Sequence, residues 1–255
     1  MAHESSKISF SNAESIEARA KIFNSLLNYD ATKEETERSL GLFIRGSLLA
    51  RIFAIQEAYQ LILGKPGYVF DIGTWRGQTA VICENLRAIY EPLNLNRKIV
   101  AFDTFTGYSG FSSKDKPTEL NKDGTYGIDD KNYADFLKKL LELHEQSNAM
   151  GNNFGKHKVI MGDCRETISK FFDDEPNSFV SLAFIDVNSY EPTAMAIEKI
   201  WTKLIPNGII AIWQLTRDRI PAEGNFYANE FLDKHAHEVT LSKTYPGLCF
   251  IKKVC

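Results

Sequence analysis

Four aspartates of this 255-residue sequence each stand at the end of a short β-rich run. They are Asp71, Asp103, Asp163 and Asp186. A carboxylate can hold a cationic amino group, and it can accept hydrogen bonds from ribose hydroxyls or from an exocyclic amine. One aspartate in such a position is often only the N-cap of the next helix. Four in succession outline a site for a nucleoside that carries a cationic amino-acid tail.

A glycine-containing segment follows the first of these aspartates and leads into a helical stretch. It spans residues 73–78 and reads GTWRGQ. Glycines let the backbone approach a ligand closely, and a helix N-terminus offers free N–H groups and a partial positive charge. The segment lacks the G-x-G-x-x-G spacing, which disfavours a dinucleotide, and it lacks G-x-x-x-x-G-K-[ST], which excludes a P-loop.

From residue 67 onward, short β-rich runs alternate with helical stretches. Runs that are apolar almost throughout, separated by helices, predict a parallel sheet covered on both faces. The predicted strands are Tyr68–Asp71, Lys98–Asp103, Lys158–Met161, Phe179–Asp186 and Gly208–Trp213, with helices near 77–90, 130–147, 164–173, 191–204 and 225–237. Two late strands, near Glu238–Leu241 and Leu248–Lys252, predict a hairpin at the sheet edge.

The amino-terminal residues 1–65 read as a helical extension or cap, which leaves 66–255 as the ligand-binding domain. Thr32 begins a capping box, and apolar residues recur at helical spacing from Leu40 to Ile62, which predicts one long helix ending at Gly64. Three roles stay open for these helices: covering the site, forming a homodimer, or simply packing on the sheet.

Residues 106–129 break the alternation of strands and helices. They are rich in Gly, Ser, Lys and Asp, and they follow the end of the strand that carries Asp103. Open α/β sheets bind ligands at the carboxyl ends of their strands, and a loop this long is usually functional or disordered. The segment is therefore predicted to be a substrate lid, with a solvated surface insertion as the alternative.

The overall composition narrows the class of protein. The 30 Lys+Arg against 33 Asp+Glu give a formal net charge of -3, which argues against a nucleic-acid partner. No apolar run is long enough to span a bilayer, and no secretory signal is visible, so we expect neither membrane insertion nor secretion. Cys83, Cys164, Cys249 and Cys255 form no C-x-x-C pair. A cytoplasmic location is expected.

Several segments together resemble class I S-adenosylmethionine-dependent methyltransferases, and more narrowly the macrocin O-methyltransferase family. The resemblance implies an α/β, Rossmann-like sheet that is mostly parallel with one antiparallel strand near its edge, and S-adenosylmethionine as cofactor. The segments that carry it are VFDIGTWRGQT (69–79), VAFDTFTGY (100–108), MGDCRET (161–167), LAFIDVNSYEPT (182–193), IEKIWTKLIPNGIIAI (197–212) and GLCFIKK (247–253).

The resemblance also implies roles for particular residues. The methionine end of the cofactor is expected near Asp71, the ribose at Asp103 and the adenine at Asp163. The full set of implied cofactor-binding residues is Asp71, Gly73, Thr74, Trp75, Gly77, Gln78, Asp103, Thr104, Asp163, Cys164 and Asp186. The candidate catalytic residues are Asp186, Tyr190 and His144.

The sequence departs from the family pattern where a metal and a base are expected. The family's I-D-x-D-x-Y segment carries Asn188 in place of its second acid, and Trp213-Gln214 replaces a pair of aspartates. Asp186 is then the one remaining candidate ligand for Mg²⁺, which usually needs one or two carboxylates. The family's catalytic histidine is also missing from the stretch 120–123, which leaves His144 as the nearest candidate.

These features favour a methyltransferase that acts on a small molecule without a metal. The acceptor classes considered are a sugar, a natural product or a surface-glycan precursor, with O-methylation favoured and N-methylation also open. One alternative is a degenerate module that binds the cofactor without turnover, although the retained Asp71, Gly73, Gly77 and Asp103 argue against it. Two others are the family's metal-dependent sugar O-methylation and a different reaction on the same fold.

Overall fold

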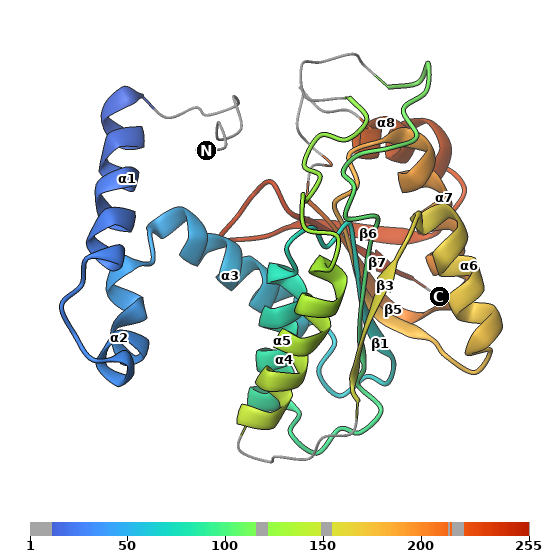
Figure 1. Cartoon of the computed structure of the whole chain (residues 1–255). Helices are drawn as coiled ribbons and strands as arrows, with labels where there is room; N and C mark the ends of the chain where they lie inside the picture. The colour runs from blue at the N-terminus through green and yellow to red at the C-terminus, as the bar shows by residue number, and fades with distance from the viewer. Residues whose placement is uncertain (1–11, 116–121, 149–154, 214, 216–221, 255) are drawn as a thin grey trace. The chain divides into compact units, whose positions relative to one another are not determined.

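The computed structural model describes residues 12–115, 122–148, 155–213, 215 and 222–254 (Figure 1). Its helices are α1 (Ala13–Leu27), α2 (Lys33–Ser39), the 3₁₀ turn η1 (Leu40–Phe43), α3 (Gly46–Gln60), α4 (Gln78–Tyr90), α5 (Tyr133–Ser147), α6 (Cys164–Asp174), α7 (Tyr190–Lys203), α8 (Ala222–Phe226) and the π-helical turn η2 (Tyr227–Phe231). Its strands are β1 (Tyr68–Ile72), β2 (Ile99–Asp103), β3 (His157–Met161), β4 (Val180–Ile185), β5 (Leu204–Ile212), β6 (His237–Leu241) and β7 (Cys249–Lys253).

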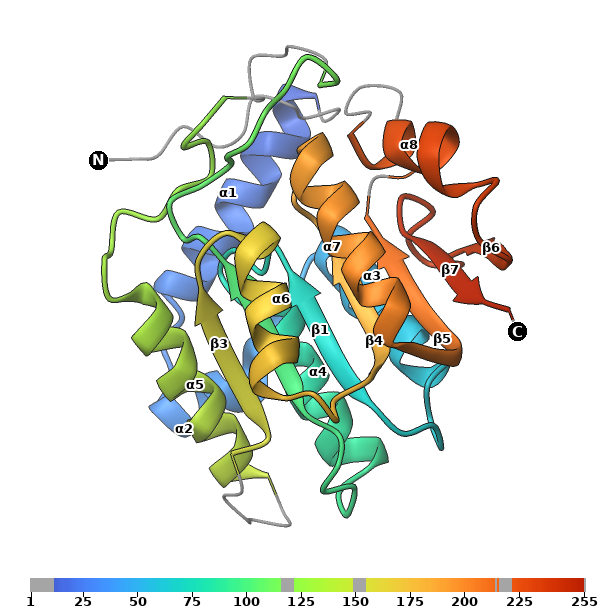
Figure 2. The same ribbon diagram turned by 90° about the vertical axis from the view of Figure 1, so that its right-hand side faces the viewer.

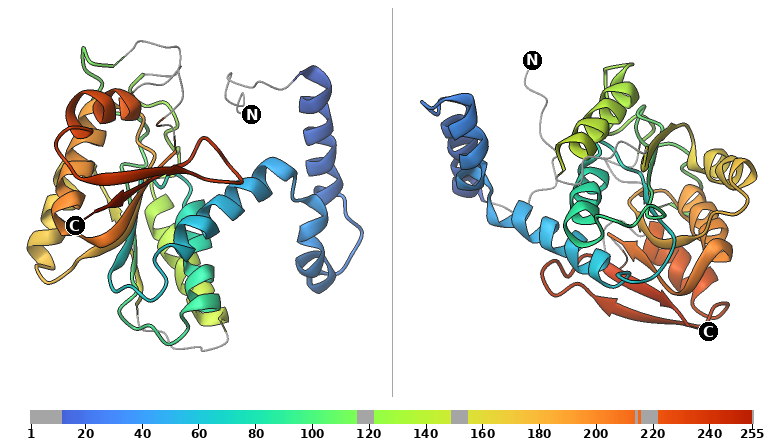
Figure 3. Two further views of the ribbon diagram at one scale, coloured as in Figure 1. Left: turned by 180° about the vertical axis from the view of Figure 1, so that it is seen from behind. Right: turned by 90° about the horizontal axis from the view of Figure 1, so that it is seen from below.

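One seven-stranded sheet organises the described part of the chain from β1 onward. Its order is β3-β2-β1-β4-β5-β7-β6. β1 to β5 pair in parallel, whereas β7 pairs antiparallel with both β5 and β6. The resulting edge hairpin is red in Figure 3. The predicted Rossmann-like sheet of the class I methyltransferases, with an antiparallel strand near its edge, is confirmed.

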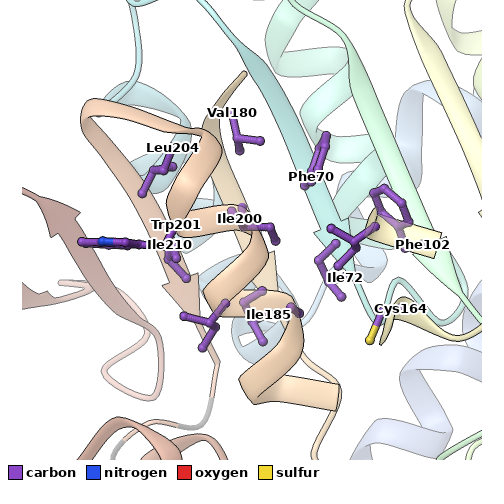
Figure 4. Packing of buried hydrophobic residues seen from close by; sticks show 14 of the residues in the cluster. Phe70, Ile72, Phe102, Cys164, Val180, Ile185, Ile200, Trp201, Leu204 and Ile210 are labelled. Atoms are coloured by element: carbon purple, nitrogen blue, oxygen red, sulfur yellow. The ribbon is translucent and has the colours of Figure 1, made fainter. Parts of the chain in front are cut away.

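Helices cover both faces of this sheet. α6 and α7 lie on one face, where Phe70, Phe102, Ile200 and Trp201 belong to one buried cluster (Figures 2 and 4). α4 and the second half of α3 bury apolar side chains against the other face. Every residue of β4 is buried, which is why this strand reads in the sequence as an apolar run interrupted only by Ser181.

The division between the compact units falls after Arg51 rather than at residue 65. The second half of α3 belongs to the sheet domain because its Ala54, Ile55 and Tyr59 are buried in a cluster with strand residues. In the amino-terminal unit the capping box at Thr32 forms as predicted. The predicted single long helix is interrupted, because η1 ends α2 and residues 44–45 are not helical before α3 begins.

The predicted late helix at 225–237 is much shorter in the structure. α8 and η2 end at Phe231, and His237 already begins β6. Phe231 packs edge-on against Trp201 with ring centroids 4.9 Å apart, and His235 packs 4.6 Å from Phe231. This aromatic packing holds the chain where it turns into the strand. Among the described residues no single helix is long and apolar enough to cross a membrane, although the bent pair 33–43 and 46–60 passes that test on length and composition.

Candidate functional site

The end of β1 brings a buried carboxylate beside the glycine segment. Asp71 is only 2% exposed, and its carboxylate accepts a hydrogen bond from the Thr74 hydroxyl. Gly73 adopts a φ of +78°, and a Cβ there would collide with the backbone carbonyl of Asp186 at the end of β4. Glycine is therefore required for the first turn to lie against the neighbouring strand end.

Asp103 at the end of β2 fixes the backbone of the loops on either side of it. One carboxylate oxygen accepts from the Trp75 amide and the other from the Phe105 amide, each over 2.7 Å. Burial raises the pKa of Asp103, and the two amide hydrogen bonds oppose that rise. Each oxygen keeps a second lone pair, so the carboxylate can still accept from a pair of ribose hydroxyls. The neighbouring Thr104 hydroxyl donates to the Gly107 carbonyl over 2.9 Å and stiffens the start of the long loop.

The first turn of α4 offers backbone N–H groups to a ligand. Gln78 begins the helix, and Gly77 occupies the N-cap with a φ of +80° and no side-chain capping bond. A Cβ at Gly77 would collide with the Leu137 side chain of α5. Trp75, which also belongs to the glycine segment, is 46% exposed. Exposed aromatic surface beside free N–H groups suits a nucleoside with a charged tail.

The Asp163 carboxylate at the end of β3 already accepts hydrogen bonds within the chain. Asp163 caps α6 by accepting from the Arg165 amide over 2.9 Å, and the Arg165 guanidinium holds both of its oxygens at 2.6–3.0 Å. Burial opposes ionisation, but these hydrogen bonds hold the pKa of Asp163 below its ordinary value. Cys164 is buried in the core, and burial raises the pKa of its thiol to about 12. Adenine recognition by Asp163 stays a prediction and would have to share these oxygens with Arg165.

Three polar residues, Asp186, Asn188 and Glu223, are connected by hydrogen bonds at the end of β4. Asn188 donates from its side-chain amide to the Asp186 carboxylate over 3.2 Å, and its backbone N–H donates to Glu223 over 2.8 Å. The backbone of Asn188 is left-handed, with a φ of +57°, which lets it face both carboxylates at once. Tyr108 is electrostatically coupled to Asp186 and Glu223, and burial is the main reason that its pKa is raised.

Tyr190 and His144 do not join this cluster. The Tyr190 hydroxyl donates to Glu230 and its ring lies 4.4 Å from the Lys114 ammonium; burial is the main reason that its pKa rises to about 12. His144 is in the last turn of α5 and contacts Asn85 at 3.3 Å. The first residue of α5, Tyr133, donates to the Arg76 carbonyl in the glycine segment. His144 lies eleven positions further along the helix, about 16 Å away. His144 therefore lies at the end of α5 that is remote from the carboxyl ends of the strands.

The described parts of the predicted lid lie at the carboxyl edge of the sheet, where the arrowheads of β1 and β3 end (green in Figure 2). The two arms of the loop pair through Tyr108, whose amide donates to Thr125 and whose carbonyl accepts from Gly124, each over 2.9 Å. Asp115 then accepts from the Tyr190 amide over 2.8 Å, and Lys114 pairs with Glu230 at 2.9 Å. The loop is thus connected to α7 and η2, while residues 116–121 lie outside the described part.

The donors near Asp186 do not fit the metal that the family resemblance implies. Asn188 turns an N–H toward Asp186, where the family pattern has an acid. Trp213 points into the core and stacks on Phe184, whereas Gln214 lies outside the described residues. Nowhere in the described ranges do three Asp, Glu, His or Cys side chains gather closely enough to hold a metal ion. A dication that prefers several oxygen ligands is therefore poorly matched by the side chains described here.

Glu223 was not predicted from the sequence. It lies in the segment between β5 and β6, which gives no local signal, because α8 is too short to show a clear helical periodicity. Its carboxyl group is completely buried, and burial raises its pKa to about 7, with smaller contributions from Asp186 and Asp115. A buried acid beside the predicted reaction centre was detectable only from the three-dimensional packing.

Known proteins share both the domain and the fold. A family model described as a methyltransferase domain matches residues 70–212. The crystal structure of CalS11, a calicheamicin methyltransferase, is 26% identical with a TM-score of 0.89 over 99% of this chain and 98% of that one. The apo structure of CalS11, described as a TDP-rhamnose 3'-O-methyltransferase, is 26% identical with a TM-score of 0.81 over 96% of each chain.

A more distant structure, the O-methyltransferase NovP, shares the fold with a TM-score of 0.57 at 12% identity, over 81% of this chain and 80% of that one. No curated protein matches the chain. The match to the family model covers more than half of the 255 residues and includes the carboxyl end of β1, the glycine segment and β4. The chain belongs to the methyltransferase domain family.

Proposed function

We propose that this protein transfers a methyl group from S-adenosylmethionine to a hydroxyl of a small sugar-containing molecule, without a metal ion. The single observation that carries the proposal is the row of Asp71, Asp103 and Asp186 at adjacent strand ends, around a glycine turn and an uncapped helix N-terminus. S-adenosylmethionine supplies an electrophilic methyl group on a sulfonium. The protein then has to bind, orient and desolvate the partners.

The residues divide this work by their positions. Asp71 and the first turn of α4 are placed to hold the two charges of the amino-acid end, a cationic amine and a carboxylate. Asp103 is placed to accept from the ribose hydroxyls. The loop that carries Tyr108 and Asp115 is proposed as the lid, because closing the carboxyl edge excludes water from the methyl group.

The sugar class rests on CalS11, whose description names TDP-rhamnose and whose likeness extends over nearly the whole chain. Metal independence rests on the donor set at Asp186, where Asn188 donates instead of coordinating. A nucleoside-diphosphate deoxysugar or a related natural-product sugar is therefore the acceptor class that we favour, with a surface-glycan precursor as a second source of the same chemistry.

The test is methyl transfer from labelled S-adenosylmethionine to a panel of nucleoside-diphosphate deoxysugars that includes TDP-rhamnose. Parallel reactions contain excess chelator, or excess Mg²⁺ after chelator treatment. We expect a labelled sugar whose rate of formation is unchanged by chelator. A rate abolished by chelator and restored by Mg²⁺ would show that the transfer needs a metal. Binding of the cofactor without transfer to any of the panel or to aminosugars would favour the degenerate module instead.

A further inference from the structure

Glu223 is a buried carboxylate that the proposed transfer, as derived above, leaves unused. Its side chain is 0% exposed. One oxygen, Oε1, accepts from the Asn188 backbone N–H over 2.8 Å. The other oxygen, Oε2, is buried and has no hydrogen-bond partner in the described part of the chain. Leaving a buried acceptor of this kind unpaired is energetically costly. A hydrogen-bond donor from outside the described part of the chain, such as a bound molecule, would satisfy it.

Asn188 connects this carboxylate to the end of β4. Its backbone donates to Glu223, and its side-chain amide donates to Asp186. Its own side-chain oxygen is also buried, again with no hydrogen-bond partner among the described residues. This cluster therefore contains two buried acceptor atoms that lack a donor among the described residues, Oε2 of Glu223 and Oδ1 of Asn188. A hydroxyl group supplies such a donor.

The cluster lies beside the glycine turn where the methyl donor is expected. Asp186, which Asn188 contacts, presents its backbone carbonyl against Gly73. The charged and titratable groups coupled to Glu223 are Asp186 from the end of β4 and Asp115 and Tyr108 from the long loop. The carboxylates are negative and the phenol is neutral, so none of these groups favours the ionised form of Glu223. Burial is the largest cause of its raised pKa, and hydrogen bonds from the backbone N–H groups of Asn188 and of Glu223 itself oppose that rise. A carboxyl group in such surroundings holds a proton more tightly than usual, as a base near neutral pH must.

We propose that Glu223 is the general base of the transfer and that Asn188 is the residue that positions it. The inference rests on the proposed function. The acceptor's hydroxyl oxygen forms the new bond to the methyl carbon while the S–C bond breaks and its electron pair stays on sulfur. The hydroxyl proton passes to Oε2 of Glu223 and leaves to solvent after product release. Glu223 thereby takes the place of the histidine that the family pattern has and this sequence lacks.

The decisive variant is Glu223→Gln, which keeps the shape and an oxygen that can accept from Asn188 but cannot take a proton. We expect kcat to fall at least about 100-fold, with S-adenosylhomocysteine affinity unchanged. The wild-type kcat/KM should rise with pH through about 7, and the variant should lose that rise. Glu223→Asp, which keeps the carboxylate on a shorter side chain, should recover part of the lost rate.

The control is Asp173→Asn near the end of α6, which also replaces a carboxylate with an amide, at an exposed position away from the strand ends. It should keep wild-type kcat. Unchanged cofactor affinity in Glu223→Gln shows that the variant is folded. Transfer by Glu223→Gln at the wild-type rate, or with the wild-type pH profile, overturns the inference alone. Wild-type protein that transfers no methyl group overturns the proposed function, and the inference with it.

Discussion

The protonation of the buried Glu223 carboxyl affects the stability of the folded protein as well as the proposed methyl transfer. Burial raises the pKa of its carboxyl from 4.5 in the unfolded chain to about 7 in the folded one. The folded protein therefore binds a proton that the unfolded chain releases between these values. Stability from this group is complete below pH 4.5 and is lost as the pH rises to 7, because the native state must then bury a charge. A shift of about 2.5 units corresponds to about 3 kcal/mol.

Replacing this carboxyl with a neutral amide should remove that loss. The unfolding free energy of Glu223→Gln, relative to wild type, should increase by about 3 kcal/mol between pH 4.5 and pH 8. Urea unfolding at a series of pH values measures it, with Asp173→Asn, at an exposed position on α6, as the control that should show no such trend. A variant that is slower yet more stable at pH 8 is the pattern of a functional residue. A difference between Glu223→Gln and wild type that is independent of pH would contradict the ionisation described here.

At the scale of elements, the start of α4 depends on the packing of α5. Gly77 has a left-handed φ, and a Cβ there would meet the buried Leu137 side chain. The free N–H groups of the first turn are therefore positioned by contact between two helices, and not by a side-chain cap. The absence of a Cβ at this one position lets α4 begin where a ligand can reach it.

Gly77→Ala should destabilise the protein by about 2–4 kcal/mol, since the backbone strain adds to overpacking against Leu137. Gly64→Ala is the matched control: its φ is +73°, but nothing lies within 4 Å of the added Cβ. It should lose only about 1 kcal/mol from the strain. Urea unfolding compares the two. Equal losses would show that the contact with α5 does not restrict this position. The collision would be confirmed if Gly77→Ala costs less stability in the Leu137→Ala background than in the wild type.

The sequence predicted these elements where one physical signal was dominant. Apolar runs predicted β1, β2, β4 and the second half of β5, because strands buried on both faces admit few polar residues. The interruption at residues 44–45 could not be predicted, because the apolar spacing continues through it. The late helix was predicted too long for a similar reason. Residues 232–236 keep helix-compatible residue types, and the packing of Phe231 against Trp201 at the end of the helix is a tertiary contact that no local pattern indicates.

At the scale of the whole molecule, the amino-terminal unit differs from the sheet domain in how little it buries. No residue of α1, α2 or η1 is buried. Even the large apolar side chains Phe23, Leu27 and Leu42 are each more than half exposed. Exposed apolar side chains in such number usually mark an interaction surface. The homodimer expected from the sequence is one occupant of that surface, and it stays a prediction.

The candidate site was predictable in part for a reason that belongs to the whole fold. Parallel strands bring their carboxyl ends to one edge, so Asp71, Asp103 and Asp186 could be assigned to a common site from the sequence alone. Glu223 could not, since its place beside Asn188 depends on how the chain returns after β5. His144 was considered by residue type alone, and the length of α5 separates it from the site.

The most direct test of the account is calorimetric titration of the purified protein with S-adenosylhomocysteine. We predict saturable binding by the wild type. Asp71→Asn should weaken it at least about tenfold, because the neutral amide loses the attraction for the cationic amine. Asp173→Ala, at an exposed position on α6, should bind as wild type does. Folded wild-type protein that gives no heat with either S-adenosylmethionine or S-adenosylhomocysteine would contradict the account.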